Sequence, residues 1–359
     1  MTIGYGLIGL GGIARTHLQA LKCFPVLGTP VPPVHLAALL TTDARKEQIG
    51  REMGFARVER DLDQFLQAGV DVVDICTPNN LHFSQILAAA QRGKHVYYEK
   101  PLCMDRTEAD KLVAKLRDCD RVIQGAYVLR FLPAVARARA LLRQGLLGRV
   151  HSFRFISYHS GYLNPHRPGS WRLQRAMSGG GALMDLGCHM LDLVRFLLGE
   201  AAEIQAWTKT VVTKRRWPRG EAAVDVDDHA LVVLGLESGA RGTVEVSRVA
   251  VGGEGMSLEI YGEKGALHID PAQANPRCVN SLGQEIMPAI EPDSFLNDLL
   301  EVFPASKLSM GWMVDAHAAS LAWFLRSVAR GKAPAGTPDL LEGARTQKLV
   351  EQAYLSAKF

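Results

Sequence analysis

The stretch Gly9-Leu10-Gly11-Gly12-Ile13-Ala14 decides the fold of this chain, because it fits the pattern G-x-G-x-x-A. It ends a short apolar run at residues 3–9 and opens a helical pattern. In a strand–turn–helix unit the glycines allow a tight turn and a close approach of the backbone to a pyrophosphate. The helix N-terminus adds N–H donors for the phosphate oxygens. The alternative is a plain glycine-rich turn. The pattern predicts a dinucleotide site at Gly9, Gly11, Gly12, Ile13 and Ala14.

The rest of the first third of the chain repeats the strand–helix rhythm. Such alternation is typical of a parallel sheet with helices on both faces. We therefore expect residues 1–125 to form an α/β Rossmann domain with a doubly wound parallel sheet. The expected strands lie at 34–40, 70–76 and 94–98, and the expected helices at 43–53, 61–68, 81–92 and 105–118.

The remaining chain has a different pattern, in which strands follow one another. Successive strands joined by short turns favour an antiparallel sheet. We expect residues 126–359 to form an α+β domain with a mostly antiparallel open sheet, and residues 270–312 to be a loop or lid with some structure of its own. The expected strands are 150–158, 202–213, 227–236, 239–248 and 256–261, and the expected helices are 133–144, 185–198, 313–330 and 339–357.

The composition excludes several classes of protein. The 359 residues suit two domains, and 22% charged and 47% hydrophobic residues argue against a disordered or fibrous chain. The net charge of +4 is spread along the chain, so we expect no nucleic-acid partner. No run of about 18 apolar residues occurs, so we expect no membrane partner. Six scattered cysteines without C-x-x-C spacing and no leader pattern predict a cytoplasmic protein.

The end of the second expected strand bears on the choice of dinucleotide. An acidic residue usually lies there in NAD-binding domains, where it hydrogen-bonds the ribose 2′-hydroxyl. Here Thr41 and Thr42 come first, followed by Asp43, Arg45 and Lys46. Hydroxyls and cations suit a 2′-phosphate, so we expect NAD or NADP with a preference for NADP, and assign Thr41, Thr42 and Lys46 to the cofactor. Alternatively, Asp43 binds the ribose and the cations are solvated.

Two further polar segments follow expected strands of the Rossmann domain. Thr77-Pro78-Asn79 follows the strand at 70–76, and Glu99-Lys100-Pro101 follows the strand at 94–98. The carboxyl edge of such a sheet is where ligands bind. A lysine before a proline is also common in surface turns. We expect this edge to contribute the cofactor-binding residues Thr77, Pro78, Asn79, His82, Glu99 and Lys100.

Taken in order, these motifs resemble the glucose-fructose oxidoreductase / inositol dehydrogenase family (Gfo/Idh/MocA). The resemblance spans nearly the whole chain outside residues 266–312. It implies an NAD(P)-dependent oxidoreductase that interconverts a secondary alcohol and a ketone on a sugar, sugar derivative or cyclitol. It also implies a homodimer or homotetramer. The motifs that carry it are Gly9 to Ala14, Thr77-Pro78-Asn79, Gly93-Lys94-His95-Val96, Glu99-Lys100-Pro101, Arg130-Phe131-Leu132-Pro133, Gly179 to His189 and Glu259 to Gly265.

Asp185 and His189 are four residues apart on an expected helix, so their side chains project from one face. An imidazole is suited to remove a hydroxyl proton at neutral pH, and a nearby carboxylate can orient it. By resemblance, Lys100, Asp185 and His189 line the substrate pocket and are the catalytic residues. A core histidine with Asp185 as a helix cap is the structural alternative. With Asp192 they make a poor metal set, so we expect no metal.

The polar and aromatic segment at 158–172 is suited to a hydroxylated ligand. A solvated loop anchored by one tryptophan is the alternative. Two other functions remain open, which are an NAD-dependent glycosidase acting by transient oxidation and elimination, and a non-catalytic dinucleotide-binding sensor. A reductase of a non-sugar substrate is a third. The expected substrate-binding residues are Lys100, Tyr127, Arg130, Tyr158, His159, Asn164, His166, Trp171, Asp185 and His189, with Arg167 as a further candidate.

Overall fold

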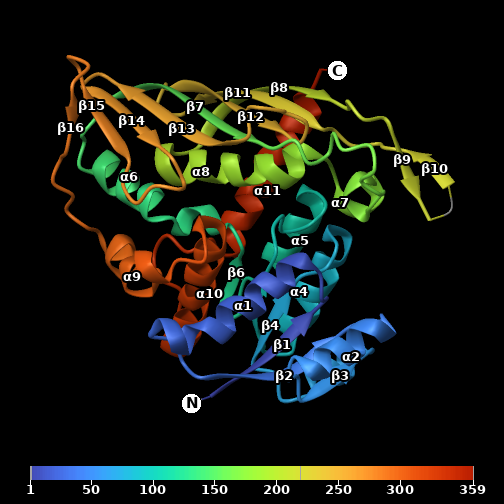
Figure 1. Ribbon diagram of the computed structural model, residues 1–359. Helices are drawn as coiled ribbons and strands as arrows, with labels where there is room; N and C mark the ends of the chain where they lie inside the picture. Colours follow the sequence, from blue (N-terminus) through green and yellow to red (C-terminus); the bar gives the residue numbers. More distant parts are fainter. Residues whose placement is uncertain (1, 219, 359) are drawn as a thin grey trace. The chain divides into compact units, whose positions relative to one another are not determined.

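The computed structural model describes residues 2–218 and 220–358, and it divides the chain into two compact units (Figure 1). Unit 1 comprises residues 2–103, 107–131 and 298–344, and unit 2 comprises residues 104–106, 132–297 and 345–358. We had expected a single boundary near residue 125. The difference is the segment 298–344, which returns to unit 1 because it carries a long helix that packs on the first helix of the chain.

Unit 1 contains a six-stranded parallel sheet, which confirms the predicted Rossmann fold. The strand order is β3-β2-β1-β4-β5-β6, so the order reverses between β1 and β4. Ligands bind at the carboxyl ends of the strands beside such a reversal. The strands are β1 (Ile3–Ile8), β2 (Val34–Leu40), β3 (Arg57–Glu59), β4 (Val72–Ile75), β5 (His95–Tyr98) and β6 (Ile123–Gly125).

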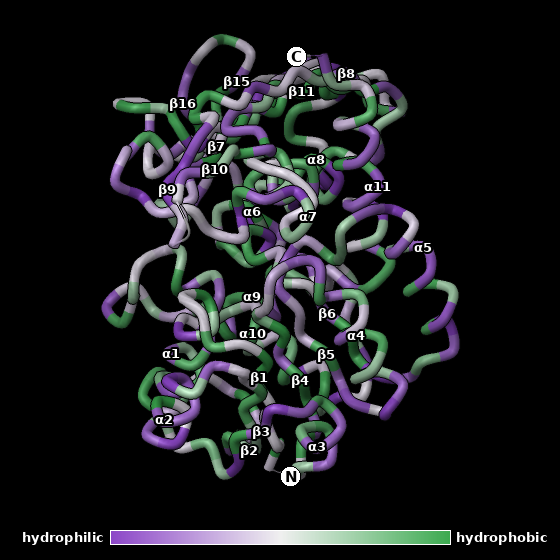
Figure 2. The backbone as a smooth tube through the Cα atoms, turned by 90° about the vertical axis from the view of Figure 1, so that its right-hand side faces the viewer, coloured by the Kyte–Doolittle hydropathy of each residue, from purple (hydrophilic) through white to green (hydrophobic). Residues whose placement is uncertain are grey.

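Helices cover both faces of this sheet. On one face Phe65, Ile86 and Leu112 pack against Val73 and other strand residues in a buried apolar core. On the other face α1 packs beside α10. In Figure 2 the strand β4 is mostly hydrophobic and the peripheral helix α2 mostly hydrophilic. The helices are α1 (Gly12–Leu27), α2 (Ala44–Glu52), α3 (Leu62–Leu66), η1 (Asn79–Leu81), α4 (His82–Gln91), α5 (Arg106–Lys115), η2 (Val128–Phe131), η5 (Ser306–Leu308) and α10 (Trp312–Arg330).

Unit 2 contains an eight-stranded sheet with the order β16-β15-β14-β13-β7-β12-β11-β8. All neighbours are antiparallel except β7 and β12, so the predicted mostly antiparallel sheet is confirmed. The strands are β7 (Val150–Tyr158), β8 (Ala201–Lys209), β11 (His229–Leu236), β12 (Arg241–Ser247), β13 (Gly255–Gly262), β14 (Gly265–Ile269), β15 (Arg277–Asn280) and β16 (Glu285–Ile286).

Helices α6 and α8 cover one face of this sheet (Figure 1). A separate hairpin, β9 with β10, follows β8, where we had expected β8 to continue to residue 213. As expected, the segment 270–312 has structure of its own, since it contains β15, β16, the whole of α9 and η5. The remaining elements are α6 (Pro133–Arg143), η3 (Trp171–Leu173), α7 (Arg175–Ser178), α8 (Cys188–Leu198), β9 (Lys214–Trp217), β10 (Gly220–Ala223), α9 (Ser294–Val302) and α11 (Leu340–Ser356).

Strand alternation separates the covered and open faces of the sheet in unit 2. The apolar residues Val232, Val233, Leu234 and Val246, taken from the sequence alone, predict one exposed apolar face. In the structure Val232, Leu234 and Val246 are buried, whereas Val233 is 38% exposed. The reason is the two-residue period of a strand, which sends neighbouring side chains to opposite faces. The open face is therefore less apolar than expected.

In the described part of the chain, none of the helices combines the length and the hydropathy that crossing a membrane would require.

Candidate functional site

The glycine turn of unit 1 has the geometry that a phosphate-binding turn needs. Gly9 has a φ of +87°, and a Cβ there would lie 2.9 Å from the carbonyl oxygen of Cys76, so only glycine fits. Gly11 precedes α1, and no side chain caps the first turn of that helix. A Cβ on Gly11 or Gly12 would meet no heavy atom within 4 Å. Among the described residues, no side chain caps the first turn of α1 and none fills the space beside Gly11 and Gly12, which leaves room for an anion at this helix N-terminus.

The end of β2 presents hydroxyls and cations, as the sequence suggested. The carboxylate of Asp43 accepts the N–H of Arg45 at 3.0 Å and caps α2. Thr41 is buried, and its Oγ1 accepts the N–H of Asp43 at 3.3 Å. Thr42 and Arg45 are exposed and Lys46 is half-buried. Asp43 therefore acts as a helix cap, which competes with the alternative that it binds a ribose.

The loop after β4 is held by side-chain hydrogen bonds. Thr77 donates from Oγ1 to Oε1 of Gln85 at 2.7 Å, Pro78 leads into η1, and Asn79 is buried. We had predicted that His82 contacts the cofactor. Its ring is buried instead, with Nδ1 2.8 Å from the carbonyl oxygen of Pro101 and Nε2 3.1 Å from that of Thr77. The structure thus corrects the role of His82, which ties two loops together.

Glu99 and Lys100 follow β5 directly, and the Lys100–Pro101 peptide bond is cis. Glu99 is buried, and its Oε1 lies 3.3 Å from Nε2 of His17 on α1. Burial alone would raise the pKa of Glu99, but the hydrogen bond and positive charge of His17 outweigh this and lower the pKa to about 2. Lys100 is half-buried and contributes to the same lowering. Glu99 is therefore a buried carboxylate next to the predicted catalytic lysine.

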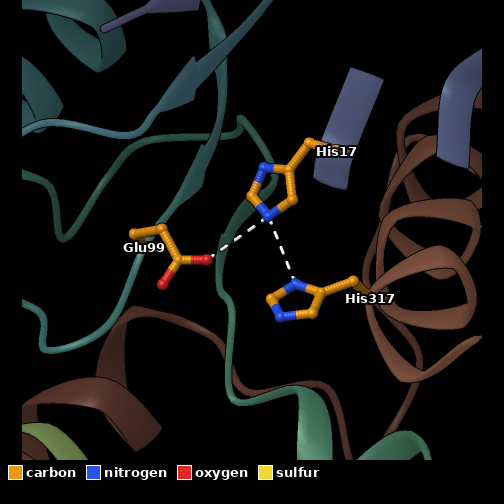
Figure 3. A group of neighbouring side chains, drawn as sticks. All are labelled: His17, Glu99 and His317. Atoms are coloured by element: carbon orange, nitrogen blue, oxygen red, sulfur yellow. Dashed lines mark hydrogen bonds and ion pairs between the residues drawn. The ribbon is translucent and has the colours of Figure 1, made fainter. Parts of the chain in front are cut away.

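Glu99 belongs to a buried polar cluster that sequence reasoning missed. His17, Glu99 and His317 point toward one another from α1, the end of β5 and α10 (Figure 3). The cluster continues to Asp74 on β4, which receives hydrogen bonds from Tyr5 at 2.5 Å and His17 at 2.9 Å. A possible signal was His17 itself, a polar residue between Ala14 and Leu18 on the buried face of a helix.

In unit 2, Asp185 and His189 lie on one helical segment, as predicted. A π-turn over Leu183–Gly187 leads directly into α8, and both side chains are half-buried. The carboxylate of Asp185 lies 3.0 Å from Nη2 of Arg248, whose side chain is 1% exposed. Burial would lower the pKa of Arg248, yet the charge of Asp185 raises it. Sequence reasoning missed Arg248, because a lone arginine after a strand carries no motif.

The glycine run before Asp185 serves packing within unit 2. A Cβ on Gly181 would lie 1.9 Å from the carbonyl oxygen of Asp227, and one on Gly180 would lie 2.2 Å from the hydroxyl of Tyr354. The Asp227 carboxylate accepts the N–H groups of Gly181 and Leu183 at 2.9 and 2.8 Å. A glycine run of this kind can bring backbone close to a ligand or to a second chain. It approaches the same chain and fixes the start of the segment that carries Asp185.

Several side chains of the segment after β7 contact the buried ring of Tyr162. His159 is half-buried, and burial and the charge of Arg248 lower its pKa. Asn164 and His166 are exposed, with Oδ1 of Asn164 accepting the N–H of His166 at 2.9 Å. The guanidinium of Arg167 stacks on Tyr162 at 3.9 Å. Trp171 is half-buried and is stacked by a neighbouring arginine, Arg172.

Tyr158 and Arg130, two of the predicted substrate-binding residues, form hydrogen bonds with other side chains of the protein. Tyr158 hydrogen-bonds Glu245, whose carboxylate also contacts His229, on the open face of the sheet. That face is opposite the one covered by α8, so the predicted substrate role of Tyr158 is not supported. The Arg130 guanidinium is buried and donates to Glu342 at 2.8 Å. Substrate contact by Arg130 and by the buried Tyr127 stays a prediction.

Two family descriptions match the two halves of the chain. Residues 3–127 match "Oxidoreductase family, NAD-binding Rossmann fold", and residues 135–268 match "GFO/IDH/MocA C-terminal domain".

Named relatives extend the match. The chain is 32% identical over 283 residues to a levoglucosan dehydrogenase of Pseudarthrobacter phenanthrenivorans, covering 74% of this chain and 73% of that protein. It is 26% identical over 267 residues to a myo-inositol 2-dehydrogenase of Thermotoga maritima, covering 74% of each. A levoglucosan dehydrogenase solved in complex with NADH and levoglucosan superposes with a TM-score of 0.88 at 26% identity, covering 99% of this chain and 97% of that chain. On this evidence the chain belongs to the Gfo/Idh/MocA family of oxidoreductases.

Proposed function

We propose that the chain is an NAD(P)-dependent dehydrogenase or reductase of a secondary alcohol on a sugar, sugar derivative or cyclitol. The observation that carries the proposal is the glycine turn, where Gly11 and Gly12 leave open space before the uncapped N-terminus of α1. The residues present fit a dinucleotide: the first turn of α1 binds the pyrophosphate, and Thr77, Pro78, Asn79 and Lys100 lie on loops that follow β4 and β5.

The chain supplies the proton-transfer and binding groups of the reaction. A bound nicotinamide would supply the hydride chemistry that interconverts the alcohol and the ketone. His189 accepts the hydroxyl proton in the direction of oxidation, because a neutral imidazole is a competent base near neutral pH. Asp185, whose carboxylate contacts Arg248, orients the imidazole of His189. The Lys100 ammonium stabilises the negative charge that develops on the substrate oxygen.

The proposed substrate class rests on relatives and on the segment after β7. Proteins named levoglucosan dehydrogenase and myo-inositol 2-dehydrogenase act on hydroxyl-rich rings, as their names state. In unit 2 the side chains of His159, Asn164, His166 and Trp171 supply the mixture of polar groups and a ring face that such ligands need. The individual substrate-binding residues are part of the proposal.

For the choice of dinucleotide we propose a preference for NADP. Asp43 is engaged as a cap, while Thr42 and Arg45 remain exposed beside Lys46 at the end of β2. The nearby acids Glu47 and Glu59 are paired with Arg60 and Arg57. A solved relative holds NADH, which makes the opposite outcome a real alternative. Tighter binding of NAD⁺ than of NADP⁺ in a calorimetric titration would overturn this preference.

We also propose a homodimer or homotetramer located in the cytoplasm. The open face of the sheet in unit 2 exposes Trp207 and Val233, and the resemblance to the family supports the proposal that subunits meet on this face. The six cysteines, which all lie in the described part of the chain, are not joined in disulfides, which supports a reducing compartment. Analytical ultracentrifugation at micromolar concentration tests the assembly, and a purely monomeric protein would contradict it.

The experiment that tests the function is an absorbance assay at the nicotinamide band with NAD⁺ and NADP⁺ against a panel of anhydrosugars, hexoses and inositols. We expect turnover with at least one hydroxyl-rich ring. Product release from a glycoside without net formation of NADH or NADPH would favour the glycosidase alternative. Tight dinucleotide binding without turnover of any ligand would favour a sensor.

A further inference from the structure

Both ring nitrogens of His17 face carboxylates inside unit 1. Nδ1 lies 2.9 Å from Oδ2 of Asp74, and Nε2 lies 3.3 Å from Oε1 of Glu99. A neutral imidazole carries one N–H, so it can donate to only one of these carboxylates. An imidazolium donates to both. Because both acceptors are carboxylates, the two contacts are satisfied together only by a proton on each nitrogen of His17.

The other neighbours of His17 agree with this assignment. Nδ1 of His317 lies 3.3 Å from Nε2 of His17, so it can accept from that N–H only as an unprotonated nitrogen. Asp74 is further held as a carboxylate, because it accepts the hydroxyl of Tyr5 at 2.5 Å and the thiol of Cys76 at 3.4 Å. The ring of Tyr97 contacts His17 edge-on and adds no charge.

Because His17, Asp74 and Glu99 are buried, their charges must be paired. The side chains of His17 and Asp74 are fully buried and that of Glu99 is 9% exposed, so an unpaired charge among them would be costly. Burial by itself lowers the pKa of His17, but the Asp74 carboxylate outweighs this and the pKa lies well above its usual value. Burial and the charge of His17 lower the pKa of His317 to about 3. One histidine is therefore charged and its neighbour neutral.

We propose that His17 is a positioning residue, an imidazolium that joins Asp74 to Glu99 and thereby fixes the Glu-Lys-Pro loop against the helix that binds the cofactor. His17 lies on α1, one and a half turns after Gly12 at its N-terminus, and Glu99 directly precedes Lys100. The ion pair thus links the phosphate-binding helix to the backbone that carries the lysine. The inference rests on the proposed function for its kinetic consequence, but not for the protonation state.

The protonation state has a direct test that needs no substrate. We expect the ¹⁵N spectrum of protein labelled in its histidine rings to show, at pH 8.5, one histidine with both nitrogens protonated, whereas an ordinary histidine has lost a proton above a pKa of about 6.5. This signal should vanish in His17→Gln and shift in His317→Gln. If His17→Gln does not fold, the shift in His317→Gln assigns the signal. A neutral His17 at pH 8.5 would overturn the proposal, even if the enzyme turns over sugars.

Two substitutions separate the two hydrogen bonds. The amide nitrogen of asparagine occupies roughly the place of Nδ1, and that of glutamine roughly the place of Nε2. His17→Gln therefore keeps a donor toward Glu99, and His17→Asn keeps one toward Asp74. We expect His17→Asn to lower kcat by about tenfold or more, and the kcat of His17→Gln to be at least about fivefold higher than that of His17→Asn. The dissociation constant for the dinucleotide should change by less than about threefold in both variants.

The matched controls are His35→Asn and His35→Gln, because His35 is exposed on β2. Equal losses of kcat in both His17 variants, accompanied by equal falls in the unfolding temperature, would indicate a structural role and overturn the proposal. Full kcat in His17→Asn would also overturn it.

Metal analysis of the purified protein tests whether this cluster binds zinc instead. The ligand atoms of His17, Glu99 and His317 lie within 4.8 Å of one another, as in a metal site. A metal would require an unprotonated Nε2 on His17, so the proposal predicts no stoichiometric zinc. One equivalent of zinc that is lost in His317→Gln would overturn it.

Discussion

Arg248 and Asp185 form an ion pair in unit 2, with Nη2 of the buried arginine 3.0 Å from Oδ2 of the half-buried aspartate. The arginine directly follows β12, and the aspartate lies in the π-turn before α8. The pair therefore ties the sheet to the helical segment that carries His189. It also places the positive charge of the guanidinium beside the Asp185 carboxylate.

Removal of this guanidinium should impair catalysis more than folding. In Arg248→Met the carboxylate of Asp185 loses its partner, and we expect kcat to fall by about tenfold or more and the free energy of unfolding by about 1–3 kcal/mol. Arg248→Lys should recover part of kcat, since it restores the charge. Steady-state kinetics and urea unfolding measure both effects. Arg241→Met, at an exposed arginine on β12, is the control. Wild-type kcat in Arg248→Met would contradict the role.

The catalytic assignment is tested by truncation of its two proton-handling groups. We expect Lys100→Met and His189→Ala each to lower kcat by about a hundredfold or more, because general acid–base and electrostatic contributions have this size. Dinucleotide affinity should stay nearly intact in His189→Ala, since His189 lies outside the Rossmann fold. The exposed residues Lys111 and His151 provide Lys111→Met and His151→Ala as controls. Full activity in either catalytic variant would remove that residue from the mechanism.

The two glycines of the turn should respond differently to substitution. Gly9→Ala should destabilise the fold, because of the positive φ and the clash with the carbonyl of Cys76. Gly11→Val places its side chain in open space, so we expect an unchanged unfolding temperature and a loss of dinucleotide affinity of about tenfold or more. Differential scanning fluorimetry and calorimetric titration separate the two effects. Wild-type affinity in Gly11→Val would exclude this turn from cofactor binding.

The buried carboxylate of Glu99 should contribute to stability in a pH-dependent way. Its pKa falls from 4.5 to about 2 on folding, so its contribution is fully present above pH 4.5 and is lost as the pH falls toward 2. By linkage the contribution amounts to about 3 kcal/mol. The difference in unfolding free energy between wild type and Glu99→Gln should therefore stay constant at and above about pH 6 and shrink as the pH falls from about 4.5 toward 2, as measured by urea unfolding. Exposed Glu237→Gln should show no such trend.

The sequence predicted the elements that depend on local patterns. The turn at Gly9 and the alternation of strands and helices fixed the Rossmann fold, because glycine conformation and hydrophobic period are local properties. The return of residues 298–344 to unit 1 could not be read locally, since it depends on the packing of α10 against α1. The same holds for one face of β11, where Val232 is buried and Val233 is not.

The sequence predicted the candidate site residues that belong to motifs. It missed the residues that join the site only through tertiary contacts. Asp185 and His189 share a helical segment because of their spacing. The partners of these groups come from distant parts of the chain, such as Arg248 for Asp185 and His17 for Glu99. His82 was assigned to the cofactor for its position after a strand, but its two carbonyl contacts could be seen only in the structure.

The most direct test of the account is calorimetric titration of cofactor-free protein with NAD⁺, NADH, NADP⁺ and NADPH, followed by the absorbance assay with sugars and inositols. We predict micromolar or tighter binding of one oxidised and reduced pair, and turnover of a hydroxyl-rich ring with the same pair. Failure of all four dinucleotides to bind would contradict the central claim, because the glycine turn would then have no role beyond the fold.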